Sequence, residues 1–249
     1  MKRAGQKNIR NKHDQNLIRL NKYIANSGIC SRREADKFIE AGVVSVNGKV
    51  ITEMGFKIKR EDLVKFNDST IKNQKLKYLL LNKPKNYTSS FKDSFKKNSI
   101  MNLIRGKCRE SIFPIGKLDK RSTGLILFTN DNDLTKKLTK KSLKIKSIYH
   151  VTLDKNLKDI DLKKIKSANW GEYNLKISEI AYASANDKKE IGIEVIGPTK
   201  NVIEKIFEKY NYQASKIDRV YYGGLTKKNI ARKESRFLTE EEISILKRQ

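Results

Sequence analysis

The most informative stretch of this chain reads Gly116-Lys-Leu-Asp-Lys-Arg-Ser-Thr-Gly-Leu-Ile-Leu-Phe-Thr-Asn-Asp131. It places one carboxylate, Asp119, in a loop that is followed directly by the apolar run 125–128. Such a run predicts a buried strand, so the loop is anchored on the core. Three cations flank the carboxylate in sequence: Lys117, Lys120 and Arg121. Nearby positive charge keeps a carboxylate ionised, which suits it for chemistry. The alternative is a turn residue among solvated surface charges.

The composition of the chain indicates an anionic partner. The chain has 249 residues, of which 37% are hydrophobic, and this is enough for one large domain or two unequal ones. The formal charge is +27, from 55 Lys and Arg against 28 Asp and Glu. Such an excess of positive charge opposes folding by self-repulsion, and it is typical of a protein whose partner is a polyanion. Nucleic acid is the leading candidate, because each neutralised phosphate releases a counterion.

The sequence shows neither the apolar segments of a membrane protein nor the residue spacing of a metal centre. No apolar run approaches the roughly 20 residues of a spanning helix, and the basic N-terminus lacks the apolar core of a signal peptide. The two cysteines, Cys30 and Cys108, and the two histidines, His13 and His150, show no metal-ligand spacing. We therefore expect a cytoplasmic protein in a reducing environment, with no disulfide framework, no metal and no membrane contact.

The N-terminal part predicts a small helical unit that ends in a hairpin. Residues 1–16 are basic and nearly free of apolar side chains, which predicts a flexible arm. Residues 17–66 then predict two short helices, the first from Leu17 with Leu20 and Ile24 at helical spacing, and the second opened by the capping box of Ser31 and Glu34. Asn47-Gly48 between alternating apolar residues predicts a tight hairpin.

The remaining chain predicts a larger α+β domain. Residues 67–77 form a Lys- and Asn-rich linker, and residues 78–249 form a sheet-rich domain. Strands are predicted near 78–81, 125–128, 147–153, 175–181, 190–196 and 217–222. Helices are predicted in the neighbouring stretches 131–140, 159–168 and 202–207, and after the capping box of Thr239 and Glu242.

The N-terminal unit resembles the S4-type RNA-binding domain. The resemblance is carried by the run from Ile18 to Lys49, in particular Ser-Arg-Arg-Glu-Ala-Asp at 31–36 and Val-Asn-Gly-Lys at 46–49. It implies that this unit binds structured RNA through its cations, which are Arg19, Lys22, Arg32, Arg33 and Lys37. Independently of the resemblance, two arginines in the first turn of a helix oppose the helix dipole, which a bound phosphate explains better than helix stability.

The second domain resembles the pseudouridine synthases, in the RsuA branch that modifies ribosomal RNA and carries an S4 domain. Three segments carry the resemblance in the expected order: Asn82-Lys83-Pro84, the stretch 116–131, and Ser-Ile-Tyr-His-Val at 147–151. The segments 219–226 and 236–239 are also similar. The resemblance covers most of the chain except the N-terminal arm.

That resemblance implies cofactor-free chemistry on a flipped uridine. Asp119 is implied as the nucleophile, and Tyr149 is implied to lie against the uracil, although a strand tyrosine can also be a plain core residue. Phosphates of the RNA backbone are implied to contact Lys83, Lys117, Lys120 and Arg121.

One position departs from the family pattern. The family places a basic residue, which pairs with the catalytic Asp, on a helix after the sheet, and that place falls on Glu204 here. A carboxylate facing Asp119 raises the pKa of one of the two carboxyl groups, and its negative charge repels RNA. Lys205 can pair with Asp119 if the register of the helix shifts by one residue relative to the family. Such a shift turns a side chain by about 100° around the helix axis. Lys200 or another nearby cation can substitute, or activity is lost.

The sequence therefore predicts a cofactor-free ribosomal RNA pseudouridine synthase of α+β fold. Its expected partner is ribosomal RNA, more specifically that of the large subunit or of an assembly intermediate. The alternative is a catalytically impaired RNA-binding or ribosome-assembly protein that keeps the same fold. Nothing in the sequence indicates oligomerisation, so a monomer is expected.

Overall fold

The computed structural model describes residues 17–90, 93–140, 145–198 and 201–249, and the predicted basic arm therefore lies outside the described residues. The chain divides into two compact units, Met1–Lys75 and Leu76–Gln249. No helix in the described ranges is long and apolar enough to cross a membrane.

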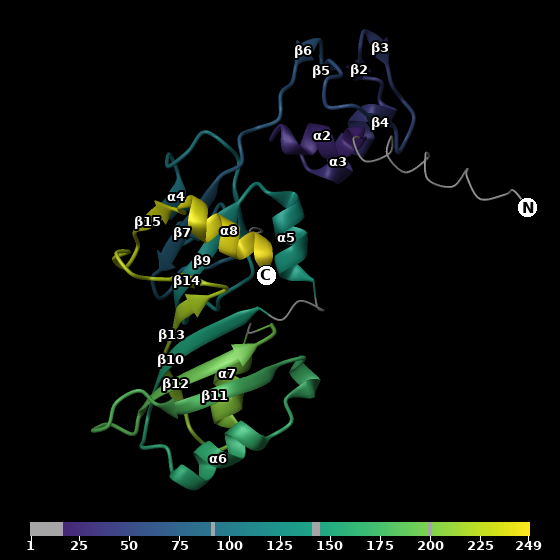
Figure 1. Ribbon diagram of the computed structural model, residues 1–249. Coiled ribbons are helices and arrows are strands. Elements are labelled where there is room, and N and C mark those ends of the chain that lie inside the picture. The colour runs from purple at the N-terminus through teal and green to yellow at the C-terminus, as the bar shows by residue number, and fades with distance from the viewer. Residues whose placement is uncertain (1–16, 91–92, 141–144, 199–200) are drawn as a thin grey trace, which may run out of the picture. The chain divides into compact units, whose positions relative to one another are not determined.

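The first unit consists of two helices and short antiparallel strands (Figure 1). Its elements are β1 (Ile18–Arg19), α2 (Leu20–Asn26), α3 (Arg32–Glu40), β2 (Val44–Val46), β3 (Lys49–Val50), β4 (Lys57–Ile58), β5 (Val64–Phe66) and β6 (Ser69–Thr70). The predicted capping box is confirmed, because Ser31 accepts from the Glu34 N–H and Glu34 accepts from the Ser31 N–H. The predicted hairpin is also confirmed, with Asn47 and Gly48 both in the left-handed region between β2 and β3.

Two boundaries of this unit differ from the prediction. The first helix begins at Leu20, because Ile18 and Arg19 pair with β4 as a strand. The unit also extends to Lys75, beyond the predicted end at residue 66. The reason is that β6 pairs with β5 and that Ile71 is buried in the core of this unit, so residues 67–75 do not form a free linker.

The second unit is built on one nine-stranded mixed sheet. Its strands are β7 (Tyr78–Lys83), β8 (Phe113–Ile115), β9 (Thr123–Thr129), β10 (Lys146–Leu153), β11 (Lys176–Tyr182), β12 (Glu190–Ile196), β13 (Ala214–Tyr222), β14 (Leu225–Thr226) and β15 (Ser235–Phe237). Its helices are α4 (Ile100–Ile104), α5 (Asn132–Thr139), α6 (Asp159–Ser167), the 3₁₀ turn η3 (Gly171–Tyr173), α7 (Val202–Glu208) and α8 (Glu240–Arg248). The strand order is β11-β12-β10-β13-β9-β7-β15, with β14 on β13 and β8 on β9.

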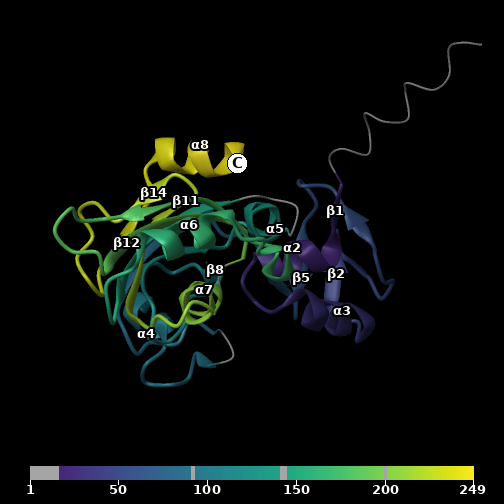
Figure 2. The ribbon, with the colours of Figure 1, turned by 90° about the horizontal axis from the view of Figure 1, so that it is seen from below.

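The adjacent strands β7 and β9 are buried on both faces. Leu79, Leu81 and Ile126 belong to a core that includes α4, α6 and α7, whereas Leu80 and Leu127 belong to a core that includes α5 and α8. Figure 2 shows α8 on one side of this sheet and α4 and α7 on the other. A strand covered on both faces needs a continuous apolar run, which is why both strands are visible in the sequence.

Candidate active site

Asp119 lies in the loop that joins the antiparallel strands β8 and β9. Its side chain is half-buried, and its Oδ2 accepts a hydrogen bond of 3.0 Å from the backbone N–H of Asn201. Asn201 is the N-cap of α7 and has a left-handed backbone, with φ of 56°. The loop and the start of α7 therefore meet at this carboxylate.

Lys83 is buried beneath the carboxylate loop. Its Nζ lies within hydrogen-bond distance of four backbone carbonyls, those of Asp119 at 2.9 Å, Ser122 at 2.5 Å, Pro84 at 3.3 Å and Lys120 at 3.5 Å, which share its three N–H donors. The residue has no exposed surface. The prediction that Lys83 contacts RNA is therefore wrong, because its charge is used inside the protein to gather the carbonyls of the loop.

Burial lowers the pKa of Lys83 to about 8, although the negative charge of Asp119 opposes this change. Below that pH the ammonium keeps its charge and its hold on the loop carbonyls. If the chain has the activity that its family resemblance implies, we expect kcat to decline above pH ~8 with a single ionisation, while RNA affinity shows no matching break, since Lys83 cannot reach RNA. A kcat profile and a binding profile over the same pH range test this. A kcat that stays level well above that pH contradicts it, and the break should be missing in Lys83→Met.

A second segment supports the loop from the other side. The hydroxyl of Ser89 accepts from the Leu118 N–H at 3.1 Å and donates to the Leu118 carbonyl at 2.7 Å. The N–H of Asn86 donates to the Lys120 carbonyl at 2.8 Å. The residues on both sides of Asp119 are thus tied to the segment that follows β7.

The exit of the loop is held by Arg219 on β13. Its Nε and Nη2 donate to the Leu125 carbonyl at 2.8 and 2.5 Å, and its guanidinium stacks on the Tyr222 ring, 4.5 Å from the centroid. Arg219 is 2% exposed and pairs in parallel with Gly124 of β9. Arg219, Ser89 and Asn201 are not among the site residues predicted from the sequence.

Tyr149 lies on β10 and is only 1% exposed. It belongs to the buried cluster that also contains Leu118, next to Asp119, and Val202 and Ile203 of α7. The fold thus places Tyr149 in the core that underlies both the carboxylate loop and the start of α7.

The predicted cationic partner of Asp119 is not found among the described residues. Within them, no lysine or arginine side chain lies within 4.0 Å of its carboxylate. The Lys205 ammonium lies instead over the Tyr173 ring, 5.7 Å from its centroid, which contradicts the Lys205 alternative. Lys200 lies outside the described residues. Glu204 forms an ion pair with Arg121, at 3.5 Å between Oε1 and Nη1, so its charge is offset.

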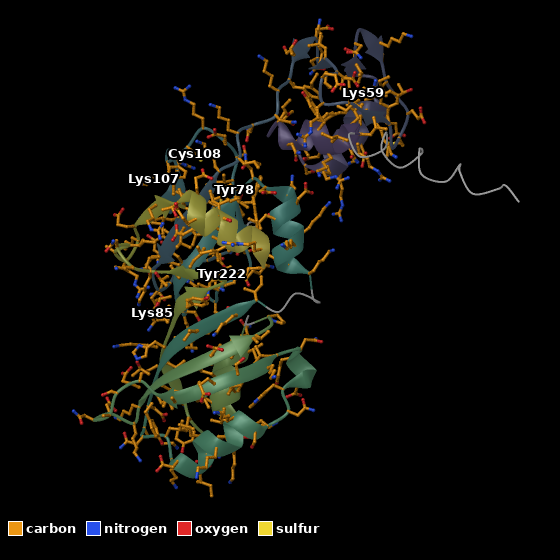
Figure 3. The ribbon with its side chains drawn as sticks, in the orientation of Figure 1. Lys59, Tyr78, Lys85, Lys107, Cys108 and Tyr222 are labelled. Carbon is orange, nitrogen blue, oxygen red and sulfur yellow. The ribbon has the colours of Figure 1, made fainter. Side chains whose placement is uncertain are left out.

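Exposed cations and grooves flank the loop. Lys117, Lys120 and Arg121 are all exposed. A groove of about 340 Å³ is lined by residues that include Lys85, Asn86, Arg121, Ser122, Glu204 and Ser215. A second groove of about 590 Å³ shares Lys85 (labelled in Figure 3) and Arg121, and it reaches His150 on β10. The lining of the first groove holds as many carboxylates as cations, whereas the second has four cations, Lys85, Arg121, Lys216 and Arg232, against Glu190 and Asp218. The second groove is therefore the better suited of the two to a polyanion.

The predicted RNA-contacting residues of the first unit spread over three of its elements. Arg19 lies on β1, Lys22 on α2, and Arg32, Arg33 and Lys37 on α3. Arg19, Arg33 and Lys37 are exposed, whereas Lys22 and Arg32 are half-buried. The Arg32 guanidinium donates to Asn21 of α2 at 3.3 Å, which connects the two helices.

Comparisons with known proteins cover both units. A family model described as RNA pseudouridylate synthase matches residues 77–243, and one described as S4 domain matches residues 18–64. An uncharacterised RNA pseudouridine synthase of Aquifex aeolicus is 32% identical over 233 residues, which are 93% of this chain and 97% of that protein. The dual-specificity RNA pseudouridine synthase RluF of Escherichia coli K12 is 33% identical, over 91% of this chain and 77% of its own.

Two further comparisons agree. The ribosomal large subunit pseudouridine synthase B of Bacillus subtilis is 29% identical over 239 residues, which are 93% of this chain and 96% of that protein. A crystal structure of a pseudouridylate synthase superposes with a TM-score of 0.61 at 23% identity, covering 92% of this chain and 99% of the other. The latter similarity shows a shared fold.

Proposed function

Because this chain belongs to the RNA pseudouridylate synthase family and carries an S4 domain, we propose that it converts a uridine of ribosomal RNA to pseudouridine. The observation that carries this proposal is Asp119, a half-buried carboxylate on a loop held by Lys83, Ser89 and the Asn201 N–H. The first unit binds structured RNA in this proposal, and the second unit performs the chemistry.

In the proposed mechanism the target uridine is flipped out of its stack, at a cost of a few kcal/mol. A carboxylate oxygen of Asp119 attacks the nucleotide as the bond between the ribose and the uracil nitrogen breaks. The uracil turns and rejoins the ribose through carbon, so that a carbon-bound proton is lost, a ring nitrogen gains one, and Asp119 is released. The reaction is an isomerisation and needs no cofactor. Tyr149 is proposed to lie against the uracil and steer proton transfer; because it is 1% exposed, the core around it has to open when the flipped base enters.

The charges at the site support activity in spite of Glu204. Arg121 engages the Glu204 carboxylate at 3.5 Å, so a bare negative charge does not meet the RNA there. The buried ammonium of Lys83 interacts electrostatically with Asp119 and donates to its backbone carbonyl. Lys117, Lys120 and Arg121 are proposed to hold phosphates of the RNA backbone.

A second function is favoured by one observation. In the described part of the chain, Asp119 has no lysine or arginine side chain within ion-pair distance. A protein of this fold that binds ribosomal RNA during subunit assembly without modifying it has no need of that ion pair.

The test is incubation with unmodified transcripts of small- and large-subunit ribosomal RNA, followed by carbodiimide treatment and primer extension. We expect one new stop, in the large-subunit transcript, since one relative is named for that subunit. RNA binding by the folded protein without any new stop supports the assembly factor instead.

We further propose that the protein acts as a cytoplasmic monomer.

A further inference from the structure

An apolar groove of about 580 Å³ lies beside α4, away from the residues assigned above. Its volume falls within the roughly 300–1,000 Å³ of small-molecule pockets. Its apolar lining comprises Phe95, Met101, Ile104, Cys108, Ile112 and Phe113, and we call it the Phe95 groove. Figure 3 labels Cys108 and its neighbour Lys107 in this part of the second unit.

Phe95 is held out of the core by its own segment. Its side chain is 81% exposed, although it is a large aromatic residue. The Asn102 side-chain amide donates to the carbonyls of Lys96 and Lys97, both at 3.0 Å. Asp93 forms an ion pair with Lys96 at 2.8 Å. The backbone on both sides of Phe95 is therefore fixed by hydrogen bonds and charge, and the ring is presented to solvent in a set place.

The surroundings of the groove are strongly cationic. Lys97, Arg105, Lys107 and Arg109 are exposed, and none of them has an acidic partner among the residues described. The groove-lining acid Glu110 lies 3.8 Å from the Lys77 ammonium. An exposed aromatic face within a cationic rim is the combination that binds single-stranded nucleic acid, because bases stack on the ring while phosphates meet the cations.

The groove is connected to the carboxylate loop by a short path. The Thr88 N–H donates to the Asn98 carbonyl at 2.8 Å, and the Ile100 N–H donates to the Thr88 carbonyl at 3.1 Å. The next residue, Ser89, exchanges hydrogen bonds with Leu118, the neighbour of Asp119. The stretch that follows Phe95 is thus hydrogen-bonded to the stretch that supports the loop of Asp119.

We propose that the Phe95 groove binds a second, unpaired base of the RNA substrate, stacked on Phe95, with flanking phosphates on Arg105 and Lys107. The assignment rests on the proposed function in that its ligand is RNA. Stacking on an aromatic ring tolerates any base, so this subsite orients the RNA strand and does not read its sequence.

The test uses the full chain and an unmodified large-subunit ribosomal RNA transcript, with filter binding at several salt concentrations. We expect Phe95→Ala to raise Kd by about 5- to 150-fold. The slope of log K against log salt should stay unchanged, because no charge is removed. Arg105→Gln should weaken binding and reduce that slope by about one. Phe95→Trp should bind with an affinity close to that of the wild type, because an aromatic ring for stacking is still present.

A matched control is Ile160→Ala on α6, an exposed apolar side chain (60% exposed) outside the groove, which should bind as the wild type does. A transcript that carries 4-thiouridine should also cross-link to the peptide containing Phe95 on irradiation. Wild-type affinity of Phe95→Ala, or a cross-link absent from this segment and from α4, overturns the proposal. These readouts measure RNA binding and do not depend on catalysis. If the wild type forms no pseudouridine, that result contradicts the proposed function but leaves the test of the Phe95 groove intact.

Discussion

Replacement of Asp119 by Asn is expected to abolish pseudouridine formation, lowering kcat by about 10⁴-fold or more. The amide has nearly the shape of the carboxylate, and its oxygen can still accept from the Asn201 N–H, which lies 3.0 Å from Oδ2 in the native protein. The Lys83 contact uses the backbone carbonyl and is unaffected by the substitution. Only the nucleophile is lost, since a neutral amide is a far weaker nucleophile than a carboxylate.

The measurement is the carbodiimide primer-extension assay on the transcript that the wild type modifies, together with RNA affinity and thermal unfolding. Asp187→Asn is a matched control, because Asp187 is also half-buried and also accepts from one backbone N–H, that of Lys189 at 2.9 Å. The control should keep wild-type activity, and Asp119→Asn should keep wild-type affinity and stability. Full activity in Asp119→Asn contradicts the proposed mechanism even if the proposed function is right.

Replacement of Gly124 by Ala is expected to destabilise the second unit by about 3 kcal/mol or more. A Cβ at this position meets the backbone of Arg219, at 2.2 Å from its O, 2.6 Å from its N and 2.8 Å from its C. These atoms belong to the neighbouring strand β13 and cannot turn away as a side chain could. Gly124 also has φ of +104°, which disfavours any L side chain.

Gly106→Ala separates the two causes, because Gly106 has φ of +78° and nothing within 4 Å of an added Cβ. Its cost should be limited to the backbone strain, about 1–2 kcal/mol. Urea unfolding of both variants, followed by circular dichroism, measures the difference. Equal destabilisation of the two variants contradicts the argument that close packing of β9 on β13 at Arg219 requires a glycine.

Short-range features could be predicted from the sequence because their causes lie within a few residues. The capping boxes of Ser31 and Thr239 and the turn at Asn47 and Gly48 form as expected, since each satisfies hydrogen bonds or backbone angles locally. The motif segments also place Asp119 on a loop that leads into a buried strand, as the structure has it. In contrast, the strands β1, β6, β8, β14 and β15 are too short to show a period and exist because a partner strand lies beside them.

The S4 domain, the synthase fold and a carboxylate loop anchored on a buried strand could all be predicted from the residues in their order along the chain. The groups that surround that carboxylate come from distant parts of the chain and are known only from the folded protein. Lys83 looks like a surface lysine in the sequence, but carbonyls about 36 to 39 residues further along the chain enclose it. Glu204 looks like a charge opposed to Asp119, but it pairs with Arg121. The group that does hold Asp119 is the backbone N–H of Asn201, and an N–H has no signature in sequence because nearly every residue carries one.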